Sequence, residues 1–216
     1  REAALKEAGL VPAVVDVEVY ALENMFRLML ENLAKPSDQG GQIKLSKGSE
    51  GLTALVDIGA TITNLYILQD NRVIFAREQG FGCDDLTIRI AESYGVPREQ
   101  AEQMKRSGEM SGEMVETVME PFKQMLAEQI GHGLQFFFSS DQYASGRYNV
   151  DTIALVGGGG MIRGLDQTVA QIIGITTVVA SPFKAMGSAS KVNSNALLRD
   201  APLLAVAGGL ALRSFD

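Results

Sequence analysis

Cysteine and histidine are almost absent from this sequence of 216 residues, and each shortage excludes a class of site. The one cysteine, Cys83, cannot form an internal disulfide, which favours a reducing compartment. The one histidine, His132, has only that distant cysteine as a possible companion, and such a pair cannot build a zinc site. Neither a disulfide scaffold nor a zinc-dependent enzyme is therefore expected.

Positive charge and long apolar runs are also scarce. The net charge of −7 argues against a protein whose main partner is nucleic acid, although it does not argue against one bound nucleotide. The longest apolar run, residues 201–212, contains Pro202 and a glycine pair and is too short to span a bilayer. No signal peptide is visible, and the composition is that of an ordinary globular protein. The chain begins inside a predicted helix without an initiator methionine, so we expect it to be the later part of a longer protein.

Apolar periodicity predicts strands followed by crossover helices, which is typical of an α/β fold. The predicted strands are residues 14–19, 52–58, 63–68, 73–78, 150–156 and 176–180. The predicted helices are residues 1–8, 20–33, 86–94, 97–106, 114–138, 161–173 and 201–213. Pro121 leaves open whether 114–138 is one kinked helix or two. Residues 35–51 are polar and rich in glycine and serine, and we predict a flexible connection there.

The most informative stretch is Leu-Val-Asp-Ile-Gly-Ala-Thr-Ile-Thr at residues 55–63. Its polar positions alternate, which predicts that all of them share one side of a strand or tight hairpin. The threonine hydroxyls and nearby backbone N–H groups could donate to phosphate oxygens, and Asp57 could hold hydrated Mg²⁺. A plain hairpin with an Asp-x-Gly turn remains an open alternative. The alternating residues are Asp57, Gly59, Thr61 and Thr63.

A second glycine-rich stretch, residues 157–160, follows a predicted strand and precedes a predicted helix, a position where α/β folds bind phosphates. It is not a Walker loop, because Leu165 and Asp166 follow Gly164 where lysine and serine or threonine are needed. It is not a dinucleotide fingerprint either, because the glycine spacing fails and Lys184 occupies the position of the distant acid. Close strand–helix packing is the structural alternative.

Two pairs of charged residues allow both structural and functional interpretations. Glu102 and Lys105 are three residues apart on a predicted helix, so they share a face and can pair with each other. That face is either solvated or overlooks a nucleotide. Asp84 and Asp85 precede a predicted helix, where capping is favoured over acid–base chemistry.

The order of these motifs resembles the second half of the actin-like ATPase fold, a ribonuclease H-like α/β fold with a mixed sheet flanked by helices. The resemblance implies that the hairpin is a phosphate loop formed by Asp57, Gly59, Ala60, Thr61 and Thr63, with Asp57 holding Mg²⁺. It implies that Glu102 and Lys105 contact ribose and adenine. It also implies an adenosine loop made of Gly157, Gly158, Gly159, Gly160, Ile162 and Arg163.

Five short runs narrow the resemblance to the PilM family, the FtsA-like proteins of type IV pilus assembly. They are Val-Asp-Ile-Gly-Ala-Thr (56–61), Phe-Ala-Arg-Glu-Gln (75–79), Glu-Pro-Phe (120–122), Gln-Phe-Phe-Phe-Ser-Ser (135–140) and Gly-Gly-Leu-Ala-Leu-Arg (208–213). The resemblance implies an ATP- and Mg²⁺-binding protein at the cytoplasmic face of the bacterial inner membrane, with no membrane insertion and no nucleic-acid partner. The implied partners are the cytoplasmic tail of PilN and other pilus inner-membrane or motor components, with self-association possible. No catalytic residue is assigned.

The same resemblance divides the chain into segments. The first segment, residues 1–51, would be a remnant of the first half, and the last segment, residues 201–216, would be a closing helix. The core of the second half would consist of residues 52–95 and 149–200. A helical subdomain, residues 96–148, would be inserted between them. The first phosphate loop and most of the PilN groove would lie in the missing first half. An actin-fold ATP hydrolase, a small-molecule kinase and an FtsA-like cell-division protein remain alternatives, as does a degenerate fold that binds only proteins.

Overall fold

A computed structural model describes residues 2–12, 15–33, 51–108, 111–144, 146–184 and 186–213. Its strands are β1 (Gly51–Ile58), β2 (Thr63–Gln69), β3 (Arg72–Gln79), β4 (Asn149–Val156) and β5 (Thr176–Val179). Its α-helices are α1 (Glu2–Glu7), α2 (Glu18–Leu33), α3 (Cys83–Tyr94), α4 (Arg98–Ser107), α5 (Gly112–Met114), α6 (Glu120–Phe138), α7 (Leu165–Ile173), α8 (Ser194–Arg199) and α9 (Ala205–Ala211). A π-helical turn, Val115–Met119, joins α5 to α6, and short 3₁₀ turns occupy Gly159–Met161 and Ala201–Leu204.

The five strands form one mixed sheet in the order β3-β2-β1-β4-β5. β1 pairs antiparallel with β2 and parallel with β4, while β2–β3 is antiparallel and β4–β5 is parallel. Asp70 and Asn71 form the β2–β3 turn with positive φ angles of 50° and 64°, a conformation that Asn and Asp tolerate in tight hairpins. The three predicted strands of this meander are confirmed.

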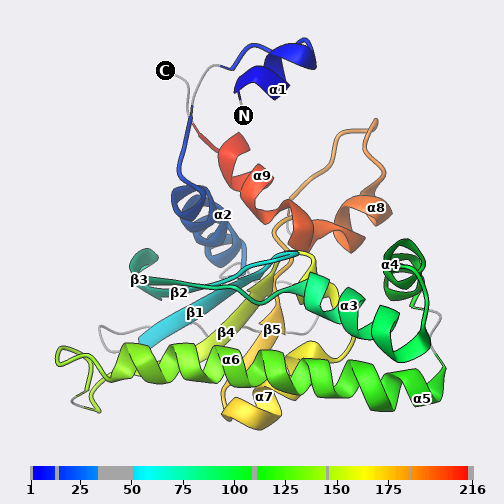
Figure 1. The fold of residues 1–216 in the computed structure, drawn as a ribbon. Helices are drawn as coiled ribbons and strands as arrows, with labels where there is room; N and C mark the ends of the chain where they lie inside the picture. The colour runs from blue at the N-terminus through cyan, green and yellow to red at the C-terminus, as the bar shows by residue number, and fades with distance from the viewer. Residues whose placement is uncertain are drawn as a thin grey trace.

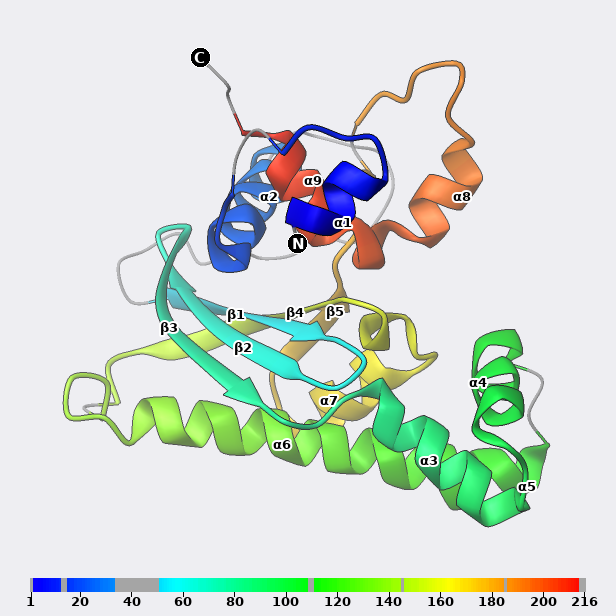
Figure 2. The same cartoon turned by 45° about the horizontal axis from the view of Figure 1, so that its top comes forward.

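Helices cover both faces of the sheet (Figures 1 and 2). Below it, the buried face of α6 packs with α7 and α3 against the side chains of Leu52, Val56 and Ile67 in the larger core. Above it, α2 and α9 pack on the smaller core that includes Leu55, Tyr66 and Val156. Adjacent strand residues thus face different helical layers, and the central strands are apolar on both faces as buried sheets require. Within the described residues, no helix is long and apolar enough to cross a membrane.

Pro121 lies in the first turn of α6, a position where the missing backbone N–H group of proline is tolerated. The π-helical turn before it lets α5 and α6 follow each other as one helical run, so both interpretations of Pro121 were partly right. Because α6 shares the larger core with the sheet, residues 96–148 contribute directly to that core. The division of the chain into segments stays a prediction.

The structure corrects three element predictions. Residues 15–17 are not a strand, and α2 begins at Glu18; residues 13 and 14 lie outside the described part of the chain. The helix expected from residue 161 begins only at Leu165, after a 3₁₀ turn. Residues 194–199, which lie outside every predicted helix and strand, form α8, whose first turn is capped by the Asn193 side chain accepting from the Ala196 N–H at 3.1 Å. The predicted connection at 35–51 lies outside the described residues except for Gly51, which begins β1.

Candidate functional site

Strand pairing brings the two glycine-bearing turns together. β1 and β4 run parallel in a register that places Asp57 beside Val156, so both strands end at the same edge of the sheet. The β1–β2 turn follows Ile58 and the glycine run follows Val156. Figure 2 shows the first turn of α3 beside this same edge. Two motifs far apart in sequence therefore lie side by side at one edge of the sheet.

Gly157 brings the glycine run into close approach with the end of β1. Its φ is +78°, and a Cβ added there would lie 2.3 Å from the Asp57 Oδ1 and 2.5 Å from the Ile58 carbonyl oxygen. Its N–H donates to the carbonyl of Pro202 at 3.0 Å. The Asp57 carboxylate thus lies directly against the glycine backbone, a contact that no other residue type permits.

Replacing Gly157 by alanine is expected to destabilise the protein by about 2–3 kcal/mol, because left-handed strain adds to a clash with the Asp57 carboxylate. Gly174→Ala is the matched control, since Gly174 has the same φ of +78° but no atom within 4 Å of its added Cβ. That variant should lose only the strain energy, about 1–2 kcal/mol. Urea unfolding of both variants measures the difference, and equal losses would remove the argument for the contact.

The β1–β2 turn, residues 59–62, corrects the prediction that its alternating residues share one face. The Gly59 N–H donates to the Ile62 carbonyl at 2.9 Å, and Ala60 and Thr61 are exposed at the tip. Asp57 pairs with Asn64, whereas Thr63 pairs with Ile58, so Thr63 faces away from Asp57. Thr63 is buried and its hydroxyl donates to the Phe81 carbonyl at 2.7 Å. Because the turn is four residues long, the alternation of faces does not continue across it. The Thr63 hydroxyl instead stabilises the hairpin from the face opposite to Asp57.

The first turn of α3 binds the tip of the hairpin. The N–H groups of Cys83 and Asp84 donate to the carbonyls of Gly59 and Ala60 at 3.0 and 2.7 Å. A Cβ at Gly82 would lie 2.4 Å from the Ala60 oxygen, so this approach needs glycine. The Gly82 N–H donates to the Asp85 carboxylate at 2.9 Å, which confirms the predicted cap. These two hairpin carbonyls are thereby hydrogen-bonded to the first turn of α3.

Burial raises the pKa of the Cys83 thiol to about 11, and the charge of Lys105 only partly counters that effect. The thiol therefore stays protonated at neutral pH and is a packing group beneath the glycine loop. A Cβ added at Gly159 would lie 2.9 Å from its sulfur.

Glu18 is the site residue that the sequence interpretation missed. It begins α2 and hydrogen-bonds to the Asp57 carboxyl; burial, the charge of Glu18 and this bond together raise the pKa of Asp57 to about 6. The same two carboxylates, after burial, help to raise the pKa of the Tyr66 hydroxyl to about 12. Glu18 was assigned to a strand with Asp16 on the face away from the valines. The signal available was the acidic residue at the start of an apolar-periodic helix.

Glu102 and Lys105 form one polar network with α3. Lys105 Nζ lies 2.6 Å from Glu102 Oε2 and donates to Thr87 Oγ1 at 2.7 Å and to the Cys83 carbonyl at 3.2 Å. Arg106 Nε donates to Glu102 Oε1 at 2.8 Å. Burial opposes ionisation of Glu102, but the hydrogen bonds from Lys105, Arg106 and Thr87 outweigh it and lower its pKa to about 2. The pair therefore fixes α4 beside the first turn of α3, next to the hairpin.

The other residues of the predicted adenosine loop come directly after Gly157 in the chain. Gly159 and Gly160 are buried in the 3₁₀ turn, where a Cβ at Gly159 would lie 2.0 Å from Ile58 Cγ2. Gly158 is exposed, and a Cβ added there would lie 3.3 Å from Leu203 Cδ2. Ile162 is partly buried and Arg163 is exposed at the far end of the loop. The hairpin and the glycine loop thus touch at Ile58 and Asp57, with their polar backbone at one edge.

Two features of this edge fit a nucleotide and Mg²⁺. At Gly157 the backbone approaches the Asp57 carboxylate without a side chain of its own between them. Burial and the charge of Glu18 disfavour the ionised form of Asp57, and a divalent cation would relieve the repulsion between the two carboxylates through the oxygen ligands that Mg²⁺ prefers. No group of three or more candidate metal ligands gathers anywhere in the described ranges, so substrate phosphates and water would have to complete the coordination.

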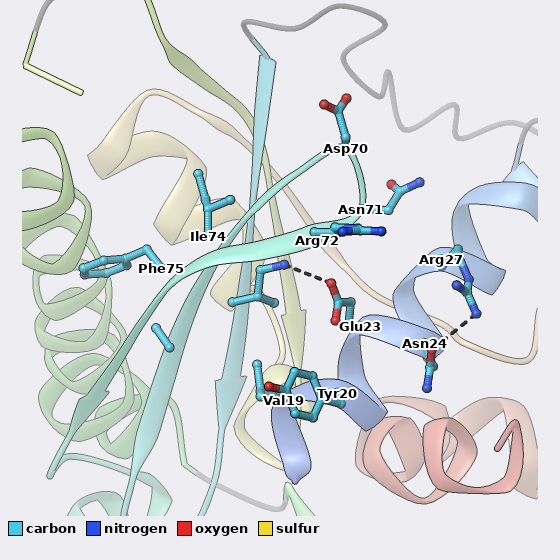
Figure 3. Close-up of a pocket in the computed structure, with 12 residues that line it drawn as sticks. Val19, Tyr20, Glu23, Asn24, Arg27, Asp70, Asn71, Arg72, Ile74 and Phe75 are labelled. Carbon is cyan, nitrogen blue, oxygen red and sulfur yellow. Dashed lines mark hydrogen bonds between the residues drawn. The ribbon is translucent and has the colours of Figure 1, made fainter. Parts of the chain in front are cut away.

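A separate cavity of about 730 Å³ lies between α2 and the edge strand β3 (Figure 3). Glu23 of α2 accepts a hydrogen bond from the Val73 N–H of β3 at 3.1 Å. Tyr20, Asn24 and Arg27 of α2 also line the cavity. Asp57 and the glycine loop are not among its lining residues. The sheet edge around Asp57 and this groove are therefore distinct.

The sheet and its two helical layers match solved actin-like structures. MreB5 of Spiroplasma citri bound to ADP superposes with a TM-score of 0.60 at 17% identity, over 98% of this chain and 62% of that one. The ethanolamine utilization protein EutJ from Carboxydothermus hydrogenoformans gives a TM-score of 0.60 at 19% identity, over 99% of this chain and 60% of that one. These likenesses, with the edge geometry, define the actin-like ATPase fold and confirm the predicted fold class.

The chain belongs to the type IV pilus assembly protein PilM family, whose model matches residues 1–215. A solved PilM–PilN type IV pilus biogenesis complex contains a chain that is 28% identical, with a TM-score of 0.75. The match covers 97% of this chain and 55% of that chain, so this chain spans about half the length of its solved relative. The predicted family is confirmed.

Proposed function

We propose that this chain contributes one side of an ATP·Mg²⁺ site in a pilus assembly protein, where the nucleotide serves mainly as a structural ligand. The observation that carries the proposal is the contact of the Asp57 carboxylate with Gly157, which joins the hairpin to the glycine loop. Asp57 would hold the metal through water, and the backbone of Gly59, Ala60 and Thr61 would meet the phosphates. The metal supplies positive charge that compensates the phosphates.

The adenosine half of the nucleotide would lie on the glycine loop, at Gly157, Gly158, Gly159, Gly160, Ile162 and Arg163. Glu102 and Lys105 would meet the ribose and adenine from α4. Their network with Thr87 supports this proposal, because it holds two polar side chains rigidly beside the hairpin. Thr63 would act indirectly, through its hydrogen bond behind the hairpin.

We further propose that the protein docks the cytoplasmic tail of PilN at the inner face of the inner membrane, and meets other pilus motor components there. Membership of the PilM family and the solved PilM–PilN complex support this partner. The chain's net charge of −7 supports a protein or peptide partner rather than nucleic acid.

Calorimetric titration tests both proposals. ATP·Mg²⁺ and a synthetic PilN-tail peptide would be titrated into this chain and into the longest natural polypeptide that contains it. ATP binding that requires Mg²⁺ is expected for the longer polypeptide. Failure of that polypeptide to bind any adenine nucleotide would instead indicate a fold that binds proteins alone, and failure to bind the peptide would remove the PilN assignment.

ATP hydrolysis is the second candidate function, and the Glu18–Asp57 pair favours it. Glu18 hydrogen-bonds to the Asp57 carboxyl, and a carboxylate held at such a site can accept a proton from an attacking water, so Glu18 is the candidate base. If the longer polypeptide hydrolyses ATP at roughly 1 per second or faster, it works as an ordinary enzyme.

In that case Glu18→Gln should lower turnover by about 100-fold or more while ATP affinity changes only a few-fold, because an amide keeps the shape but cannot act as a base. Steady-state turnover measured beside calorimetric binding separates the two effects. Glu23→Gln is the matched control on the same helix, since Glu23 binds the Val73 N–H away from Asp57 and should leave turnover unchanged. Full turnover in the Glu18 variant would assign the base elsewhere.

A further inference from the structure

Lys123 is the one charged residue among the buried polar residues in the described part of the chain; the others are all threonines. Its side chain is 8% exposed and lies on the face of α6 that packs into the larger core. Burying an ammonium group costs free energy that an apolar side chain at the same position would not. An ordinary core helix has no need of a lysine there.

The ammonium group has two polar partners. It lies 2.6 Å from the Glu120 carboxylate, one turn earlier on α6, and donates to the Arg163 carbonyl at 3.5 Å. A Cβ added at Gly164 would lie 3.4 Å from the same nitrogen. Lys123 therefore reaches from α6 to the far end of the glycine loop, where the chain turns into α7.

The glycine loop has hydrogen bonds within its own backbone, in addition to its packing on Ile58 and Cys83. The N–H groups of Met161, Ile162 and Leu165 donate to carbonyls three residues earlier, at 3.1–3.3 Å. These bonds keep the loop compact, but they do not fix its place relative to the helical layer. The bond from Lys123 to Arg163 supplies a link of that kind.

The neighbouring residue connects the same helical turn to the hairpin. Phe122 stacks on Phe81, with ring centroids 5.4 Å apart and planes inclined by 21°. The Phe81 carbonyl is the acceptor for the Thr63 hydroxyl that braces the hairpin. Consecutive residues of α6 thus support both halves of the site.

We propose that Lys123 is a positioning residue: its ammonium group holds the Arg163 carbonyl so that the glycine loop is placed to receive adenosine. The inference rests on the proposed nucleotide function and extends it to a residue outside the motifs. Lys123 touches no ligand in this scheme. It acts through the backbone of residues 157–164.

Lys123→Met is the informative variant, because methionine keeps the length and packing of the stem and removes the charge. Amide hydrogen exchange of residues 159–165, measured without nucleotide, should become about tenfold faster, the effect of one lost charge-assisted hydrogen bond. ATP affinity of the longest natural polypeptide should fall about tenfold for the same reason. The melting temperature should stay equal or rise, because the desolvation cost of the buried ammonium group is removed while the Glu120 carboxylate left behind is 41% exposed to water.

Glu120→Gln is the matched control. It leaves the ammonium group bound to Arg163 but without its carboxylate partner, so the melting temperature should fall while loop exchange and ATP affinity change less than in Lys123→Met. A purely structural lysine would instead lower stability and affinity together in both variants.

Unchanged loop exchange in Lys123→Met would overturn the positioning role, whatever the ATP result. Faster exchange with unchanged ATP affinity would overturn its link to the nucleotide. If the parent polypeptide binds no adenine nucleotide, the proposed function fails, and the exchange measurement still decides whether Lys123 positions the loop.

Discussion

Asp57→Asn is expected to abolish Mg²⁺-dependent ATP binding and, at pH 7.5, to make the protein without nucleotide more stable. The binding loss follows from removal of the carboxylate proposed to hold the metal, and we expect affinity to fall by about 100-fold or more, as for loss of a buried charged partner. The gain in stability follows from the raised pKa of Asp57, which means that its ionised form is disfavoured in the folded state.

The pH dependence fixes the sign of this second effect. The carboxyl has a pKa of 3.8 in an unfolded chain and about 6 in the folded protein, so the folded state binds the proton more tightly. Stability of the parent protein therefore falls as the pH rises from about 4 to about 6 and stays reduced above that range. Asparagine carries no charge at any pH, so the variant should gain on the order of 1–3 kcal/mol above pH 7 and little at pH 4.

Chemical denaturation at pH 4 and pH 7.5, with and without ATP·Mg²⁺, measures both effects. Asn64→Ala is the control at the paired position of β2, because it leaves the two carboxylates in place. If the Asp57→Asn variant loses stability at pH 7.5, the ionised form of Asp57 is not disfavoured by Glu18 in the folded protein. A variant that keeps Mg²⁺-dependent binding would remove Asp57 from the metal site.

Gly209→Ala should have the largest effect on folding. A Cβ at Gly209 of α9 would lie 1.8 Å from the carbonyl oxygen of Ala21 in α2 and 2.4 Å from its carbon, so the two helix backbones would have to separate. Neither atom belongs to a flexible side chain. We expect a loss of more than about 3 kcal/mol, because overpacking against backbone cannot relax by rotamer changes.

Gly208→Ala is the matched control one residue earlier on the same helix. Its added Cβ would meet the Met25 sulfur at 2.8 Å and the Phe183 ring at 3.1 Å, and both are side-chain ends that can shift. The gain in helix propensity of about 1 kcal/mol should offset much of that cost. Thermal unfolding should show a large drop for Gly209→Ala and a small change for Gly208→Ala; equal changes would show that α9 can move away from α2.

Several elements could be predicted from the sequence because local pattern and tertiary role agree. The β1–β2–β3 meander has apolar runs ended by turn residues, and the Asp70–Asn71 turn adopts the positive φ angles that those residues tolerate. Gly95 and Gly174 end α3 and α7 in the left-handed conformation that the helix-stop rule predicts.

Other features depend on contacts that no local pattern contains. Val15, Val17 and Val19 alternate like a strand, yet Val19 already lies in α2, which packs on the sheet beside α9. Glu18 becomes a site residue only through contact with Asp57, and the face of Thr63 depends on the length of the turn before it. Lys123 resembles any helical lysine until its surroundings are known.

The parallel pairing of β1 with β4 has a consequence for how the site comes into being. Its two halves follow residues 57 and 156, which become neighbours only through this non-local strand pair. Closing so long a stretch of chain costs entropy that is recovered only when the helices between the strands have packed. Neither glycine turn can therefore reach its final geometry in an early, partly folded chain. The proposed nucleotide binding should arise together with the completed sheet, and nucleotide added during refolding would select only molecules that have already joined β1 to β4.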